Sequence, residues 1–223
     1  MAEAAELRTK IYVWEFPVRL SHWVNVLALT VLSVTGLYIG TPFLSPVSDT
    51  AFTMGWMRFL HLVAGYTFLM MVILRIYWSF VGNKYSNWRV FVPRSKSQVQ
   101  DLKEVTDYYL FRRSAPPYDE GHTACAAFAY FFLYLAFIFQ IFSGFALFYN
   151  NSHTAVHFIL GGWLAYLVNI KTIRFWHHLL MYPIWAFVIV HIYLSMVMES
   201  ASRSGLLGSI FGGYKFMAGR SWE

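Results

Sequence analysis

The chain has 223 residues, of which 58% are hydrophobic, 20% aromatic and only 13% charged. Soluble domains carry about 25% charged residues, so this composition excludes an ordinary water-soluble domain and indicates an integral membrane protein. The net charge of +6 indicates basic loops on the cytoplasmic side of a membrane rather than a nucleic-acid-binding surface. The single cysteine excludes an internal disulfide, a cysteine-ligated iron–sulfur cluster and covalent haem attachment through CxxCH.

Four apolar segments are long enough to cross a bilayer, because about 20 helical residues span its hydrocarbon core. The predicted helices cover residues 19–40, 58–81, 124–149 and 175–198. Segments rich in glycine, proline and asparagine follow the first three of them, as expected for helix ends. The sequence therefore predicts an all-α fold, an integral membrane bundle of four transmembrane helices in a single domain over residues 1–223.

Basic residues orient this bundle. With the N-terminus inside, segments 1–20, 82–123 and 199–223 lie in the cytoplasm and carry thirteen lysines and arginines, against three on the other side. The positive-inside rule then places both termini in the cytoplasm. The thirteen are Arg8, Lys10, Arg19, Lys84, Arg89, Arg94, Lys96, Lys103, Arg112, Arg113, Arg203, Lys215 and Arg220, and the three are Arg58, Lys171 and Arg174.

Two loops connect the later helices. Residues 82–123 form a polar cytoplasmic loop in which DLKEVTDYYLFRR is predicted to be a short interfacial helix. Residues 150–174 form a periplasmic loop whose semi-apolar part, 155–169, is too short to span a bilayer comfortably. We expect that part to lie at the outer surface or to pack on a partner.

The fourth predicted helix contains two histidines on one face. His177 and His191 are 14 residues apart, so they lie within about 40° of each other and about 21 Å apart along the axis. His177 is near the outer end and His191 nearer the inner side. Ionisable residues inside membrane segments are costly, and they indicate function when they recur in a pattern.

The first two helices each place one histidine at a matching depth. His22 begins the first helix at the inner side, level with His191, and His61 begins the second at the outer side, level with His177. We call His61 and His177 the outer pair, and His22 and His191 the inner pair. Paired imidazoles between facing helices suit a six-coordinate haem iron, so the spacing predicts two stacked haems.

His178 competes with His177 for the outer pair. It lies about 140° from His191 around the helix, so both cannot face one bundle interior, and we favour His177. The other histidines, at 122, 153 and 157, have no partner at a matching depth and are not predicted to be ligands.

Four further residues are candidate haem contacts. Gly36 and Gly65 face the predicted cofactors, where a missing side chain permits close approach; the alternative is ordinary small-residue helix packing. Arg75 either pairs with a haem propionate or extends to the cytoplasmic surface. Arg19 is either a propionate partner of the inner haem or simply a cytoplasmic basic residue.

The chain resembles the b-type cytochrome subunits of membrane-bound Ni/Fe-hydrogenases over almost its whole length. The resemblance rests on RLSHWVNVLALTVLSVTG, RFLHLVAG, LRIYWSFVGNKYS with FVP, SGFALF and WHHLLMYPIWAFVIVHIY. The R-x-x-H-W…TG element and the H-x13-H element are specific in combination. His178 departs from the family pattern, which often has arginine there.

The resemblance implies a multi-pass subunit of the bacterial inner membrane with two non-covalent haems b. Such a subunit belongs to the respiratory chain. It anchors the small iron–sulfur and large subunits of a periplasm-facing hydrogenase, and it passes electrons from H2 oxidation through the outer and inner haems to menaquinone or ubiquinone. In related subunits the quinone lies near the inner haem and the start of the third helix, which makes His122 and Thr123 candidate quinone contacts.

By the same resemblance the chain is an electron-transfer subunit and not an enzyme on its own, with membrane lipid and no nucleic acid among its partners. An equivalent subunit of a formate dehydrogenase or thiosulfate reductase is the alternative, although GNKYS and SGFALF favour hydrogenase. A transporter with histidines as proton relays is more remote, because it predicts unpaired histidines and helices broken at mid-bilayer.

Overall fold

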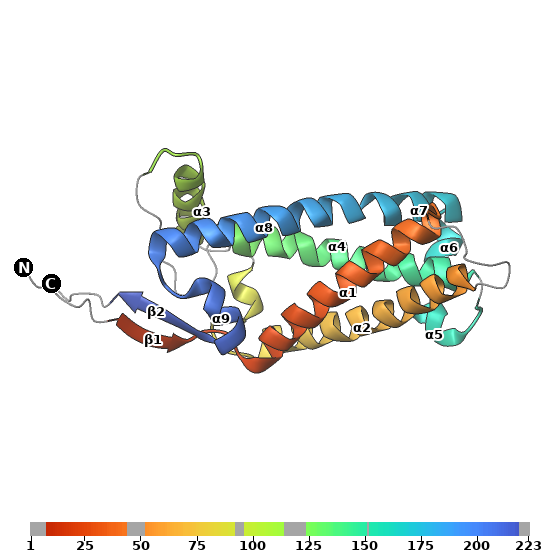
Figure 1. Ribbon diagram of the computed structural model, residues 1–223, viewed down its shortest axis with the longest axis horizontal. Helices are drawn as coiled ribbons and strands as arrows, with labels where there is room; N and C mark the ends of the chain where they lie inside the picture. Colours follow the sequence, from red (N-terminus) through yellow and green to blue (C-terminus); the bar gives the residue numbers. More distant parts are fainter. Residues whose placement is uncertain (1–7, 44–51, 92–95, 114–123, 151, 219–223) are drawn as a thin grey trace, which may run out of the picture. The chain divides into compact units, whose positions relative to one another are not determined.

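The computed structural model describes residues 8–43, 52–91, 96–113, 124–150 and 152–218. Four helices in this part of the chain are long and apolar enough to cross a membrane (Figure 1). They span Phe16–Gly40, Thr53–Val81, Cys125–Tyr149 and Ile170–Ser202. The predicted helical fold with four membrane-spanning segments is confirmed.

The first three spans are single helices, α1 (Phe16–Gly40), α2 (Thr53–Val81) and α4 (Ala124–Tyr149). The fourth is divided into α7 (Ile170–Leu179) and α8 (Met181–Ser202), where the sequence predicted one helix. Pro183 explains the division, because proline has no N–H to donate to the carbonyl oxygen of Leu179. Leu180 keeps right-handed helical torsion angles between them, φ −68° and ψ −17°.

The remaining elements are short. They are β1 (Arg8–Tyr12), η1 (Trp88–Val90), α3 (Lys96–Tyr109), α5 (Ala155–His157), η2 (Phe158–Gly162), α6 (Leu164–Leu167), α9 (Leu206–Gly212) and β2 (Tyr214–Ala218). The semi-apolar stretch 155–169 thus forms short helical turns rather than a fifth span.

The chain divides into two compact units, and each of the four spans contributes to both. Unit 1 contains residues 1–20, 76–132 and 188–223, and unit 2 contains residues 21–75 and 133–187. The polar termini and the loop after α2 belong to unit 1. Unit 2 contains most of the apolar parts of α1, α2 and α4, together with the α5–α7 region.

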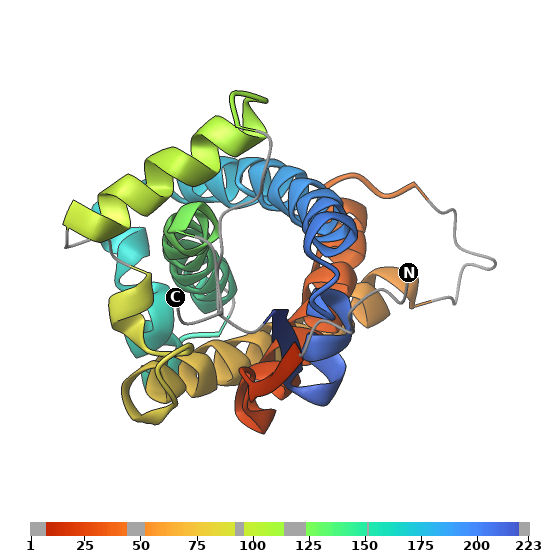
Figure 2. The ribbon, with the colours of Figure 1, turned by 90° about the vertical axis from the view of Figure 1, so that its left-hand side faces the viewer.

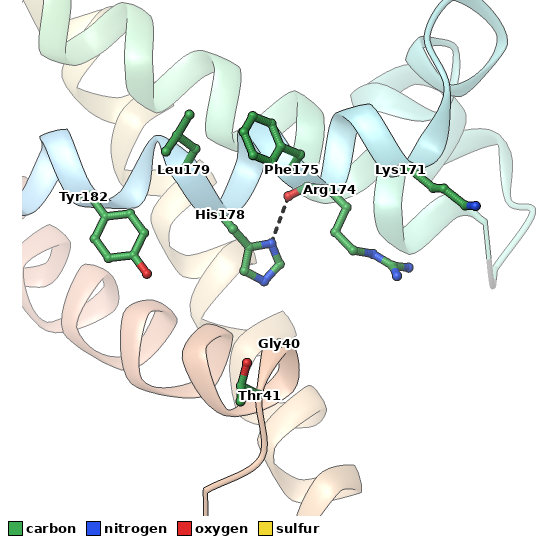
Figure 3. Close-up of a pocket in the computed structure, with 8 residues that line it drawn as sticks. All are labelled: Gly40, Thr41, Lys171, Arg174, Phe175, His178, Leu179 and Tyr182. Carbon is green, nitrogen blue, oxygen red and sulfur yellow. Dashed lines mark hydrogen bonds between the residues drawn. The ribbon is translucent and has the colours of Figure 1, made fainter.

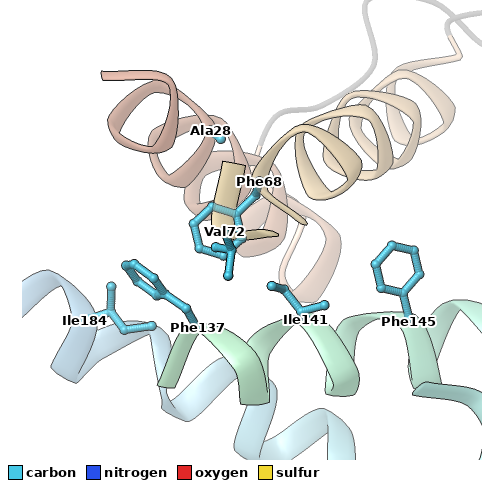
Figure 4. Packing of buried hydrophobic residues seen from close by; sticks show 7 residues of the cluster. All are labelled: Ala28, Phe68, Val72, Phe137, Ile141, Phe145 and Ile184. Atoms are coloured by element: carbon cyan, nitrogen blue, oxygen red, sulfur yellow. The ribbon is translucent and has the colours of Figure 1, made fainter. Parts of the chain in front are cut away.

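Unit 2 has a hydrophobic core to which all four spans contribute (Figure 4). Phe68 and Val72 of α2 face α4, and the rings of Phe68 and Phe137 meet edge to face with centroids 4.9 Å apart. Ala28 of α1 and Ile184 of α8 complete the cluster. Within a bilayer such packing, rather than exclusion of water, holds helices together, so this cluster fixes the helix faces that carry the histidines.

Unit 1 contains a two-stranded ribbon that the sequence analysis did not predict. β1 pairs antiparallel with β2, with Lys10 opposite Phe216. The backbone N–H of Val13 continues the pairing by donating to Gly213 O at 2.8 Å. These segments come from opposite ends of the sequence, and their pairing requires both to lie on the same side of the membrane.

A single carboxylate ties the start of α1 to the end of α2. Oε2 of Glu15 accepts hydrogen bonds from Trp78 Nε1 at 2.8 Å, from the Asn83 backbone N–H at 2.8 Å and from Ser86 Oγ at 3.3 Å. Asn83 Nδ2 also donates to Val13 O at 2.9 Å. Asn83 and Ser86 belong to the GNKYS motif, so the motif has a structural role within unit 1.

A helix is present in the loop after α2, but as α3 (Lys96–Tyr109) it begins and ends earlier than the predicted 101–113. Figure 2 shows α3 along its length while the first turns of α4 are seen end-on, so the two helices cross. Val105 of α3 is only 1% exposed, whereas Asp101 on the same helix is exposed. α3 is therefore amphipathic, with one side packed on unit 1.

Candidate functional site

Unit 2 brings the outer pair together. His61 lies in the third turn of α2 and His177 near the end of α7, and their imidazoles are close enough to interact electrostatically. His178 interacts with both. The two histidines that the sequence placed at equal depth are thus neighbours in the folded unit.

Thr35 and Gly36 of α1 hold the ring of His61. Thr35 Oγ1 lies 2.9 Å from Nδ1 of His61. A Cβ atom at position 36 would lie 3.2 Å from Cε1 of the same ring, which is tighter than ordinary van der Waals contact. Gly36 was predicted to admit a macrocycle, and its missing side chain makes room for the imidazole itself.

Ser143 and Gly144 of α4 hold the ring of His177 in the same way. Ser143 Oγ lies 2.8 Å from Nδ1 of His177, and a Cβ atom at position 144 would lie 3.1 Å from Cε1. Gln140, one turn earlier, donates from Nε2 to the backbone carbonyl oxygen of His177 at 3.0 Å. The side chain and the backbone of His177 are therefore both fixed by α4.

The side chain of His178 lies beside Gly40 at the end of α1. Its Nδ1–H donates to the carbonyl oxygen of Arg174 at 2.9 Å, and a Cβ atom at position 40 of α1 would lie 3.0 Å from its Nε2 (Figure 3). It lines an open groove with basic and aromatic neighbours. The groove is lined by Gly40, Thr41, Lys171, Arg174, Phe175, His178, Leu179 and Tyr182.

The inner pair is divided between the two units. His22 belongs to unit 2, where its ring meets Trp23 edge to face with centroids 5.2 Å apart. His191 belongs to unit 1, where its Nδ1 lies 3.0 Å from the hydroxyl oxygen of Tyr130 on α4. The pairing of His22 with His191 stays a prediction.

The two candidate arginines have different surroundings. Arg75 is 6% exposed, so its side chain is enclosed by protein, and it interacts electrostatically with Tyr134. Arg19 donates from Nη1 to the carbonyl oxygen of Phe211 in α9, which gives it a structural role in unit 1. The side chain of Arg75 is therefore enclosed by protein and does not extend to the surface of the folded chain.

The other predicted contacts are less informative. A Cβ atom at Gly65 would meet only Leu32 Cδ2, at 4.0 Å, which is ordinary helix packing. His122 and Thr123 lie outside the described residues. His157, which was not predicted to be a ligand, bonds through Nε2 to the hydroxyl of Tyr66 at 2.6 Å and thereby fastens the outer loop to α2.

The sequence analysis missed the residues that hold the outer pair. Thr35 and Ser143 each directly precede a glycine within a spanning helix, and each hydroxyl meets an imidazole. The signal was present in the VTG and FSG triplets, because a hydroxyl beside a glycine places a polar atom next to a gap on one helix face. Tyr130 gave no comparable signal among so many aromatic residues.

The outer pair fits a haem iron by the chemistry of its donors. In each ring Nδ1 is engaged by a hydroxyl, which leaves Nε2 as the nitrogen available to a metal. A ligand histidine held through its other ring nitrogen is the usual arrangement at metal sites. His61 and His177 could therefore both hold the iron of one haem.

Comparisons with known proteins identify the family of this chain. The family described as prokaryotic cytochrome b561 matches residues 13–213. The chain is 36% identical over 211 residues to the probable Ni/Fe-hydrogenase 1 B-type cytochrome subunit of Escherichia coli K12, covering 92% of this chain and 90% of that protein. It is 36% identical to the probable Ni/Fe-hydrogenase B-type cytochrome subunit of Cupriavidus necator (92% and 86% covered) and 35% identical to that of Rhodobacter capsulatus (96% and 84%).

Proposed function

Because the chain belongs to the prokaryotic cytochrome b561 family, a family of multi-pass inner-membrane proteins, we propose that it is the electron-transfer subunit of a membrane-bound Ni/Fe-hydrogenase. It receives electrons released by H2 oxidation and delivers them to menaquinone or ubiquinone. The names of the similar proteins support the hydrogenase partner over a formate dehydrogenase or thiosulfate reductase.

The proposal rests chiefly on the convergence of His61 and His177 within unit 2. Two neighbouring imidazoles, each held at Nδ1, are a poor arrangement for a proton relay but a suitable one for holding a haem iron. Haem b, when bound, supplies a carrier that takes up and releases one electron at a time. His61 and His177 hold the outer haem, and His22 and His191 hold the inner one.

Other residues of the chain support these ligands. Arg75, enclosed in unit 2, provides a positive charge for a propionate, and Arg19, whose Nη1 donates to Phe211 O, contributes a second positive charge at the inner side. Gly36 leaves room for the His61 ring beside the outer haem, and Gly65, which packs ordinarily against Leu32, is the weaker candidate haem contact. His122 and Thr123 contact quinone near the inner haem.

The proposed topology places both termini in the cytoplasm and the hydrogenase on the periplasmic side. The pairing of β1 with β2 supports a common side for the termini, and the excess of basic residues in the same segments supports the cytoplasmic side. The small iron–sulfur subunit then docks at the outer end of the spans, on the side of the outer pair, and the large subunit binds to it.

Haem quantification and quinone reduction in the purified hydrogenase complex test this proposal. We expect two haems b for each copy of this chain. His191→Ala should remove the inner haem and abolish H2-dependent quinone reduction, because electrons could no longer leave on the quinone side. A complex without a b-type absorption band, or a His191→Ala variant with both haems and normal quinone reduction, would contradict it.

A further inference from the structure

Each histidine of the outer pair meets a hydroxyl that is already committed as a donor. We propose that Thr35 and Ser143 are positioning residues that fix the tautomer and orientation of His61 and His177, so that Nε2 of each ring is unprotonated and directed at the metal. This inference rests on the proposed function, because it assigns the two histidines to a haem.

The direction of the Thr35 bond follows from counting protons. The threonine hydroxyl has one proton and can accept two hydrogen bonds. Thr35 Oγ1 donates that proton to the carbonyl oxygen of Val31 at 2.6 Å, one helical turn earlier. We therefore assign the 2.9 Å contact with His61 as a bond in which Nδ1–H donates to Oγ1; the backbone of Leu32 also hydrogen-bonds the His61 ring. A neutral imidazole protonated at Nδ1 has its free lone pair on Nε2.

The same count applies to Ser143 on α4. Its hydroxyl donates to the carbonyl oxygen of Gln140 at 3.2 Å, so the 2.8 Å contact with His177 is donated by Nδ1–H. Gln140 donates in turn to the backbone carbonyl oxygen of His177. In both cases, therefore, a backbone carbonyl oxygen accepts the hydrogen bond from the hydroxyl. The hydroxyl oxygen then accepts from the imidazole of the other helix, which selects the tautomer protonated at Nδ1.

Burial makes this selection effective. Ser143 is 0% exposed and Thr35 is 3% exposed, so water cannot replace either hydroxyl as the acceptor. The glycine that follows each hydroxyl lets the ring approach the helix closely enough for the bond to form, since a Cβ atom there would crowd Cε1. A hydroxyl residue followed by a glycine thus forms a contact site for one imidazole. Thr35–Gly36 on α1 and Ser143–Gly144 on α4 are two such sites.

Hydrogen bonding at Nδ1 also makes an imidazole a stronger electron donor, which favours ferric over ferrous iron. Removing the acceptor should therefore raise the midpoint potential of the outer haem and weaken its binding. Changes of this kind at metal sites cost about 10–100-fold in affinity. The inner haem should be unaffected.

The test compares variants of the full chain in the purified hydrogenase complex. Thr35→Val keeps the shape and removes the hydroxyl, and Thr35→Ser restores it; Ser143→Ala and Ser143→Thr form the second pair. Thr30→Val is the matched control on α1, because Thr30 also donates to the carbonyl oxygen one turn earlier, that of Val26, but contacts no histidine. Ser79→Ala is the control for Ser143, since Ser79 Oγ donates to Ile76 O three residues earlier.

Redox titration and low-temperature electron paramagnetic resonance provide the readouts. In Thr35→Val and Ser143→Ala we expect a raised outer-haem potential, shifted low-spin g values and about 10-fold weaker haem retention. We expect values close to wild type in Thr35→Ser, Ser143→Thr and both controls. Loss of the outer haem in Thr35→Val with its retention in Thr35→Ser also supports the proposal.

Two results would overturn it. One is an unchanged potential and spectrum in Thr35→Val and Ser143→Ala; the other is equal damage in the hydroxyl-restoring and hydroxyl-removing variants. Failure of the proposed function would look different, because the wild-type complex would then lack haem b or His61→Ala would retain every haem.

Discussion

The outer pair, in unit 2, and His191, in unit 1, contact different kinds of oxygen. His61 and His177 meet aliphatic hydroxyls that donate to their own helix backbones, whereas His191 meets the phenol of Tyr130 at 3.0 Å. The backbone fixes the direction of the first two bonds. A phenol at the end of a ring is not tied to its own helix in this way, so its bond to His191 can run in either direction.

This difference separates two ways of placing a ligand. In unit 2 each imidazole is oriented by a hydroxyl that is itself bonded to a carbonyl oxygen of its own helix. The imidazole therefore has little freedom to change its orientation. In unit 1 the position of the imidazole depends on how a long side chain of α4 packs. We therefore expect substitutions in unit 2 to act on the presence of the outer haem, and those at Tyr130 to act on the properties of the inner one.

The largest expected difference is between the alanine variants of the two adjacent histidines of α7. His177→Ala should remove the outer haem, because it removes the proposed ligand imidazole that Ser143 of α4 holds. His178→Ala should leave both haems in place, since His178 is held by the Arg174 carbonyl oxygen and faces the groove beside Gly40. Difference spectra with haem quantification measure both variants. Retention of haem in His177→Ala with loss in His178→Ala would reverse the assignment.

The next effect concerns the stability of unit 1 alone. Glu15→Ala removes the common acceptor of Trp78, Asn83 and Ser86. Ser86 keeps an acceptor in Asn83, whereas a buried donor left without one costs about 1–3 kcal/mol. We expect a lower Tm in detergent and an unchanged outer-haem spectrum below the transition. Glu15→Gln should lose less, because it keeps an acceptor oxygen. An unchanged Tm in Glu15→Ala would show that this carboxylate does not hold the unit together.

A smaller effect is expected at the inner side. Tyr130→Phe removes the hydroxyl beside His191 and should shift the inner-haem potential while both haems are retained. If Nδ1–H of His191 donates to Tyr130, the potential should rise, as in Thr35→Val but by less. Redox titration resolves the two haems. A shift of the outer haem in this variant would break the distinction between the two regions.

The smallest effect is expected at the exposed ion pair of α3. Hydrogen bonds from Arg113, which has the larger effect, and from Gln100 lower the pKa of Glu104 below its usual 4.5. Its stabilising contribution is therefore present above pH 4.5 and is lost as the pH falls through the lowered value. Glu104→Gln should slightly accelerate amide hydrogen exchange in α3 at pH 7 and leave both haems unchanged. Altered haem spectra would contradict a purely local role.

Much of this architecture could be predicted, because membrane spans have a strong signal in composition and length. The fourth span was predicted as one helix; Leu180 separates α7 from α8 but keeps helical torsion angles. The β1–β2 ribbon could not be predicted, because each strand has five residues and its partner lies some 200 residues away. Thr35 and Ser143 could not be assigned without knowing which helix faces meet.

The central claim is that His61 and His177 bind the same haem, and a double variant tests it most directly. Haem should be quantified in the purified complex for wild type, His61→Ala, His177→Ala and the double variant. The account predicts that each single variant loses one haem per chain and that the double variant loses no more. Loss of a second haem in the double variant would mean that the two histidines serve different haems, and retention of all haem would mean that neither is a ligand.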